Sequence, residues 1–89
     1  MASTSPGTTR QEAERAFDHV FRIAEAAGFH RSEIVYVDLA FLDLADVGEV
    51  NALYGALFPE GRRPARTIHQ AAALPFGGRI KVQAIAARA

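Results

Sequence analysis

The chain has 89 residues, with ten basic side chains, ten acidic side chains and no cysteine. This length allows one domain, and the zero net charge argues against recognition of nucleic acid through a broad basic surface. Without cysteine there is no disulfide or thiolate metal site, and no apolar run approaches the ~20 residues that span a bilayer. Residues 1–8 are small and polar and lack the pattern of a signal peptide, so we expect a disordered tail on a cytoplasmic protein.

The first predicted element is a helix over residues 10–27. Its apolar residues recur at the three- and four-residue spacing of one helical face: Ala13, Ala16, Phe17, Val20, Ile23, Ala24 and Ala27. Thr9 followed by Glu12 has the spacing of a capping box, and Gly28 is suited to the left-handed residue that ends a helix.

A strand is predicted over residues 34–42, where β-branched and aromatic residues run almost unbroken. Such a composition is typical of a strand that is covered on both faces. Asp38 interrupts the run. We favour a strand-end or partly solvated carboxylate for it, with a paired or functional carboxylate as the alternative.

The next predicted element is a second helix over residues 47–58, for which Asp46 and Glu49 repeat the capping spacing. Its apolar stripe consists of Val47, Val50, Leu53, Tyr54, Leu57 and Phe58. Asn51 lies beside this stripe. We expect it to hydrogen-bond a neighbouring backbone or loop, with ligand contact as the alternative.

Two strands complete the chain, one opened by Pro64 and one over residues 79–86. The breaker-rich stretch 74–78 between them predicts a hairpin with Arg66 at its mouth. The order helix, strand, helix, strand, strand predicts an α+β fold, a small mixed sheet with two helices on one face. Three strands leave an open sheet edge, so we expect a homo-oligomer or a second chain that completes the sheet.

Four segments occur in order and at the right spacing for a known family: residues 50–58 (VNALYGALF), 64–67 (PART), 74–75 (LP) and 80–86 (IKVQAIA). They resemble the carboxy-terminal two-thirds of the RidA family, also called YjgF or endoribonuclease L-PSP. The resemblance covers residues 9–89, which we expect to form a truncated RidA-like domain lacking the amino-terminal strands. It implies a chorismate-mutase-like trimer with clefts between subunits, which hydrolyses small 2-imino or 2-enamino acids to 2-oxo acids and ammonia.

The same resemblance implies a site. Arg66 stands where the family holds the ligand carboxylate, and Asn51, Thr67 and Ile68 are expected to contact the ligand beside it. Gln83 takes the catalytic position, where the family usually carries a glutamate. A glutamate can accept a proton from water, whereas an amide can only orient the water. No cofactor and no metal are expected.

Two other hypotheses stay open. The chain could be a non-catalytic binding or regulatory subunit that keeps the carboxylate site and is completed by a partner chain or by oligomerisation. RNA cleavage is the third hypothesis. The zero net charge argues against it, as does the lack of aromatic residues among the basic ones. Arg62 and Arg63 are candidates for an anion-attracting rim near Arg66.

Overall fold

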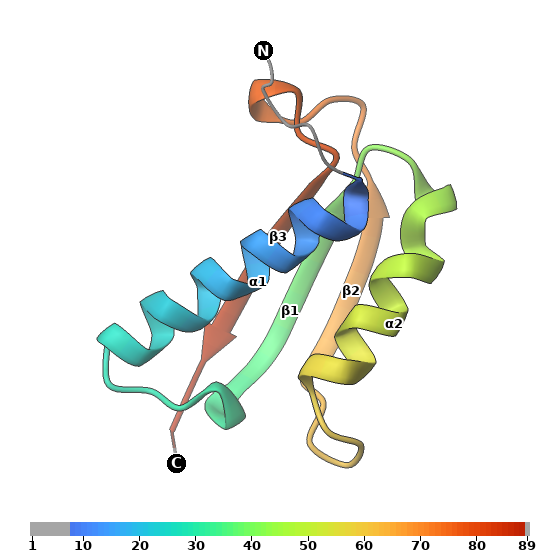
Figure 1. Ribbon diagram of the computed structural model, residues 1–89. Helices are drawn as coiled ribbons and strands as arrows, with labels where there is room; N and C mark the ends of the chain where they lie inside the picture. Colours follow the sequence, from blue (N-terminus) through green and yellow to red (C-terminus); the bar gives the residue numbers. More distant parts are fainter. Residues whose placement is uncertain (1–7, 89) are drawn as a thin grey trace.

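The central element of the fold is β1 (Ile34–Phe41), because both other strands pair with it. The computed structural model describes residues 8–88, whose three strands form one mixed sheet in the order β2-β1-β3 (Figure 1). The strand β2 (Ala65–Gln70) pairs with β1 in parallel, and β3 (Ile80–Ala86) pairs with it antiparallel. The predicted mixed α+β sheet is confirmed. The expected tail lies outside the described residues, except for Thr8.

The predicted hairpin is wrong, since β2 and β3 lie on opposite edges of β1. The connection between them crosses the end of β1, where the Ala71 amide donates to the Phe41 carbonyl and the Leu42 amide donates to the Arg79 carbonyl. The physical reason lies in composition. The apolar β1 gains most from having both edges paired, whereas the polar and largely exposed β2 is suited to an edge.

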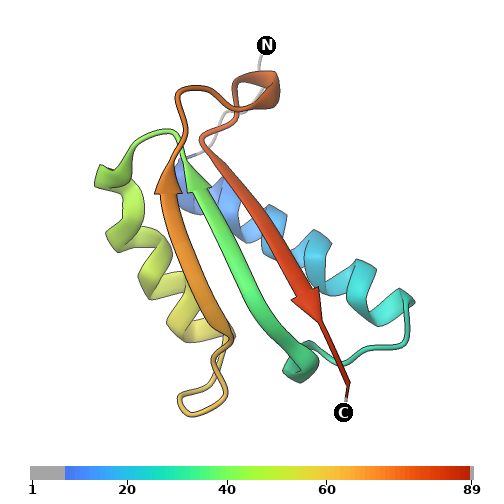
Figure 2. The same cartoon turned by 180° about the vertical axis from the view of Figure 1, so that it is seen from behind.

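Both helices, α1 (Thr9–Ala26) and α2 (Val47–Leu57), cover the same face of the sheet (Figure 1). Viewed from behind, the strands lie in front of both helices, and no described element covers this second face (Figure 2). Two helices on one face were predicted, but the prediction that both faces of β1 are covered is wrong for the described residues. Neither helix is long and apolar enough to cross a membrane.

The core lies between the helices and the sheet and is rich in aromatic rings. Phe17 of α1 contacts Tyr54 and Phe58 of the second helical segment edge to face, at centroid distances of 6.3 and 6.0 Å. The strand β1 contributes Val37, Leu39 and Phe41, which are all fully buried. The amphipathic stripes read from the sequence are therefore the core faces of both helices.

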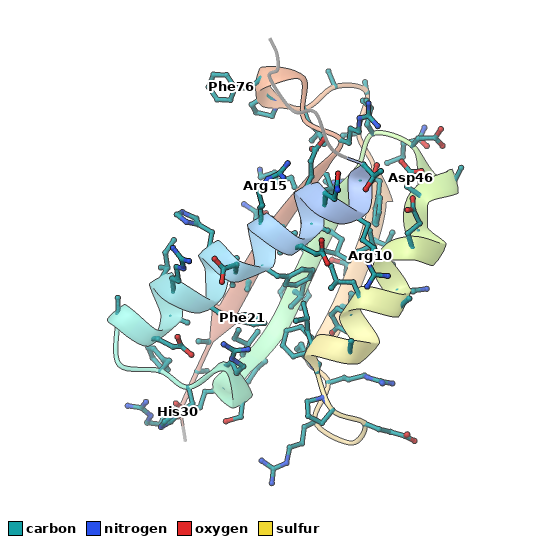
Figure 3. The ribbon with its side chains drawn as sticks, in the orientation of Figure 1. Arg10, Arg15, Phe21, His30, Asp46 and Phe76 are labelled. Carbon is teal, nitrogen blue, oxygen red and sulfur yellow. The ribbon has the colours of Figure 1, made fainter. Side chains whose placement is uncertain are left out.

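The predicted helix caps are shifted or replaced. The capping box of α1 is formed by Thr8 and Gln11, one residue before the expected pair. The next residue, Thr9, is buried, and its hydroxyl donates to the Asp46 carboxylate at 2.7 Å. Asp46 therefore joins the start of α2 to the first turn of α1 (Figure 3) and makes no side-chain cap for its own helix. The predicted left-handed stop is confirmed at Gly28, which has a φ of 90°.

An arginine near the end of the chain fastens β3 to the turn that follows α1. Arg88 donates from Nε to Glu33 Oε2 at 2.6 Å and from Nη2 to the Gly28 carbonyl at 2.6 Å. Its guanidinium also lies 4.8 Å from the centre of the Phe29 ring. The hydrogen bond from Arg88, helped by the backbone amide of His30, lowers the pKa of Glu33 from 4.5 to about 2.

We predict that Glu33→Gln lowers the melting temperature at neutral pH. Because the folded-state pKa of Glu33 is depressed, its contribution to stability is present above pH 4.5 and is lost as the pH falls toward 2. The difference between variant and wild type should therefore close over that range in thermal melts followed by circular dichroism. The matched control is Glu14→Gln, which removes only an exposed 3.8 Å pair with Arg10. Parallel curves for Glu33→Gln and the wild type at all pH values would contradict the prediction.

Candidate functional site

The first group of candidate residues lies where α2 meets the edge strand β2. Arg66 is next to Val37 in the sheet and points to the helix side. Its guanidinium carbon lies 4.5 Å from the centre of the Tyr54 ring, and Nη1 donates to Asn51 Oδ1 at 2.5 Å. The Tyr54 hydroxyl in turn donates to the Pro64 carbonyl at 2.9 Å. The side chain of Arg66 is thus held from two directions by α2.

Tyr54 is suited to this supporting role. Burial raises the pKa of its hydroxyl above the ordinary value, although the positive charges of Arg66 and Arg63 oppose that shift. The hydroxyl therefore keeps its proton and remains a donor to the carbonyl of Pro64. A tyrosine one turn after Asn51 on α2 places the ring and the amide side by side under the guanidinium.

Arg66 keeps donors free for a ligand. A guanidinium has five N–H donors in a planar fork, and Asn51 is the one described residue that accepts from it. Asn51 is exposed, and its partner is the Arg66 side chain rather than the neighbouring backbone or loop that we expected, because its position on α2 faces the arginine and solvent. The remaining donors of Arg66 fit one carboxylate in a bidentate arrangement.

The two loop arginines that are candidates for an anion-attracting rim differ in their contacts. Arg63 donates from Nε to the Phe58 carbonyl at 3.0 Å and lies within 3.5 Å of the Gly55 carbonyl. These carbonyls lie at the carboxy-terminal end of α2, where backbone carbonyls have no hydrogen-bond donors within the helix. Arg63 therefore caps a helix, while Arg62 is exposed in the loop.

The second group lies on the open face of the sheet, around Asp38. Asp38 has Thr67 beside it on β2 and Gln83 beside it on β3. Thr67 Oγ1 donates to Asp38 Oδ1 at 2.6 Å, and the Tyr36 hydroxyl is 2.6 Å from the same Thr67 oxygen. Since the Thr67 proton is given to Asp38, Tyr36 is the donor to Thr67. His69 lies two residues after Thr67, on the same face of β2, with Nδ1 3.5 Å from Asp38 Oδ1.

A shallow hollow of about 410 Å³ lies on this face. It is lined by Tyr36, Asp38, Gln83, Ala84 and Ile85. The sequence analysis did not single out Tyr36, and it gave a functional carboxylate at Asp38 only as the alternative. The available signal was the acidic residue within an otherwise apolar strand. The structure places Asp38 in the middle of β1 with a partly exposed side chain, so the partly solvated carboxylate that we favoured is confirmed and the strand-end position is not.

The predicted site residues therefore divide between two faces. Arg66 and Ile68 point to the helix side, where Ile68 packs partly buried against the core. Thr67 and Gln83 point to the open face, because successive residues of a strand alternate. The structure brings Arg66 and Asn51 together but separates both from Gln83. Among the described residues, no group of three or more potential ligands lies close enough to hold a metal ion.

A model of the Endoribonuclease L-PSP family matches residues 2–88. The chain belongs to this family. The resemblance inferred from the four sequence segments is thereby confirmed, and it extends over both helices and all three strands of the described residues.

Individual members of the Endoribonuclease L-PSP family agree with the assignment. A protein of Rattus norvegicus named 2-iminobutanoate/2-iminopropanoate deaminase is 40% identical over 81 residues, which are 91% of this chain and 58% of the rat protein. The crystal structure of the Escherichia coli YjgF gene product superposes with a TM-score of 0.87 at 37% identity, covering 94% of this chain and 68% of that one. The crystal structure of Escherichia coli TdcF with bound serine superposes with a TM-score of 0.86 at 29% identity, covering 94% of this chain and 68% of TdcF. The chain thus spans less than two-thirds of the rat relative.

We predict that Thr67→Val destabilises the protein by about 1 kcal/mol, because it removes the hydroxyl that links Tyr36 to the Asp38 carboxylate. Urea unfolding followed by circular dichroism measures the change. Thr67→Ser keeps the hydroxyl and is the matched control, which should retain most of the stability. Equal midpoints for the valine and wild-type proteins would show that the hydrogen-bonded chain contributes nothing.

Proposed function

We propose that this chain acts, together with further copies of itself, in the hydrolysis of small 2-imino acids to 2-oxo acids and ammonia. The observation that carries the proposal is the arrangement of Arg66, which is held against Tyr54 and Asn51 with donors left for a carboxylate. The name of the rat relative supports this substrate class. The serine bound to TdcF, a small molecule with a carboxylate next to the substituted carbon, supports the size of the ligand.

The chemistry requires little beyond orientation and proton transfer. A bidentate guanidinium fixes the carboxylate, and through it the adjacent C=N carbon, against a positioned water. Gln83 can hold that water through its amide. Beside Arg66 on β2, Thr67 lies on the open face and Ile68 on the helix side. No cofactor enters the reaction that we propose.

The proposed cleft needs two copies of the chain. Arg66 and Gln83 lie on opposite edge strands, about 10 Å apart across the sheet by strand spacing, and on opposite faces. A three-carbon or four-carbon imino acid cannot contact both within one chain. We therefore place Arg66 of one copy against the open face of another.

Features of the surface support an assembly of copies. Both edge strands have one side without a strand partner among the described residues, and such edges favour pairing with further chains. Ile85 is exposed on the open face. Phe76 is fully exposed at the tip of its turn, where it points away from the rest of the molecule (Figure 3) with a left-handed φ of 59°. A strained aromatic residue in solvent is more readily explained by a contact in an assembly.

A second candidate function is a non-catalytic carboxylate-binding or regulatory subunit of the same family. The observation that favours it is the amide at Gln83, since an amide cannot accept the proton of an attacking water. This subunit would be completed by a partner chain or by oligomerisation. RNA cleavage is disfavoured because Arg31, Arg63 and Arg88 are occupied by groups of their own chain and the net charge is zero.

We predict that Arg66→Ala lowers kcat/KM by about 10²- to 10⁴-fold, since two charge-assisted hydrogen bonds to the substrate are lost. The assay measures ammonia released from 2-iminobutanoate generated in situ. Arg66→Lys keeps the charge without the fork and should fall between alanine and wild type. Arg62→Ala, an exposed arginine of the adjoining loop, is the matched control and should behave as wild type.

Equal rates for Arg66→Ala and Arg62→Ala would contradict the assignment of Arg66. The assay also separates the two candidate functions. If the wild type binds 2-oxobutanoate without releasing ammonia, and Gln83→Glu creates the activity, the chain is the non-catalytic subunit.

We also predict that the protein is a stable oligomer, with a trimer of the 9.6 kDa chain as the expected form. The two sheet edges and the open face each offer surface that a second copy can cover. Size-exclusion chromatography with light scattering measures the mass directly. A well-folded monomer at micromolar concentration would contradict a cleft made from two copies.

A further inference from the structure

The open-face hollow contains a carboxylate that the proposed mechanism has not yet used. Asp38 lies in the middle of β1, and its side chain is 24% exposed, neither sealed in the core nor fully solvated. It is the one carboxylate among the residues that line the hollow. Asp38 lies between Thr67 and Gln83, so it is next to the amide that orients the attacking water in the function that we propose.

The carboxylate of Asp38 is held in a fixed orientation. The Tyr36 hydroxyl donates to Thr67, and Thr67 donates to Asp38 Oδ1, each at 2.6 Å. Within residues 8–88, Oδ2 of Asp38 has no hydrogen-bond donor. One oxygen is therefore anchored, and the other is available to a water molecule in the hollow.

We propose that Asp38 is the general base of the hydrolysis, accepting the proton that Gln83 cannot accept. The proposal rests on the function proposed above and adds a catalytic residue to it. Gln83 and Asp38 then share the work on one water, since the amide orients it and the carboxylate takes its proton. Tyr36 and Thr67 are positioning residues, because they act through Asp38.

The reaction balances with Asp38 as a proton carrier. The water oxygen forms a bond to the imine carbon while the π electrons of C=N move to nitrogen, and the water proton passes to Asp38 and then to that nitrogen. In the second step the hydroxyl oxygen forms the carbonyl as the C–N bond breaks. The hydroxyl proton follows the same route, so that ammonia leaves and Asp38 is again a carboxylate.

Two other groups on this face can compete for the role of base. His69 is exposed, and its Nδ1 lies 3.5 Å from Asp38 Oδ1, which is too long for a strong hydrogen bond. Lys81 lies on the same face of β3, two residues before Gln83, and is not among the residues that line the hollow. The helices contribute no group here, because they cover the other face.

The test is Asp38→Asn, which keeps the shape of the side chain and an acceptor for Thr67. We expect kcat to fall about 10²- to 10⁴-fold with KM little changed, as for loss of a general base. The matched control is Asp18→Asn, an exposed carboxylate of α1, which should keep wild-type kinetics. Adding Gln83→Glu to Asp38→Asn should recover part of the rate, because a carboxylate again lies in the hollow.

A second variant guards against loss of folding and separates catalysis from packing. Asp38→Ala opens space in the hollow, so that added formate should restore turnover to this variant but not to Arg66→Ala. A residue with only a structural role would not be rescued by a small carboxylate. Thermal melts identify any variant that does not fold.

The two-copy cleft has its own measurement. Arg66→Ala and Asp38→Asn, each expected to be slow alone, should gain activity when they are unfolded and refolded together, because some clefts then combine an intact Arg66 with an intact Asp38. No gain on mixing would overturn the cleft between copies.

The outcomes distinguish the two proposals. Wild-type turnover in Asp38→Asn would overturn the assignment of Asp38 and leave the proposed function standing. Loss of turnover in His69→Ala with full turnover in Asp38→Asn would transfer the role of base to His69. If the wild type releases no ammonia above the uncatalysed rate, the proposed hydrolysis fails, and the assignment of Asp38 fails with it.

Discussion

The pairing of β1 on both of its edges is the constraint on which the rest of the structure depends. Because strand residues alternate between faces, the central position of β1 fixes the face of every neighbouring residue on β2 and β3. Val37 has Arg66 and Ala84 beside it on the helix side, and Asp38 has Thr67 and Gln83 beside it on the open side. A slip of one residue would exchange the two sets and carry the arginine away from α2.

The two faces differ in chemistry because they differ in what covers them. The helix side is filled by aromatic rings from both helices, and Arg66 rests on Tyr54 at its margin. The open side carries hydrogen-bonded polar groups and a shallow hollow. In the function that we propose, the two faces therefore supply two half-sites rather than one cleft. For this reason assembly and chemistry are linked in the function that we propose.

Sequence prediction failed where a local signal had a close competitor. Thr8 with Gln11 and Thr9 with Glu12 have the same capping spacing. The capping box forms at Thr8 because the Thr9 hydroxyl donates instead to Asp46, the residue before α2. The hairpin failed for a related reason. A turn between two strands does not require those strands to pair, and a more apolar strand from earlier in the chain lies between them.

The sequence by itself determined the types of the helices and strands, the bounds of both helices to within one or two residues, the α+β class and the family. Only the tertiary structure decided the strand order, the exposed contact of Asn51 with Arg66, and the separation of Arg66 from Gln83. Periodicity, turns and caps are encoded within a few neighbouring residues. The partner of a side chain such as Asp38 depends instead on register with Thr67, which is 29 residues away, and no local pattern specifies that register.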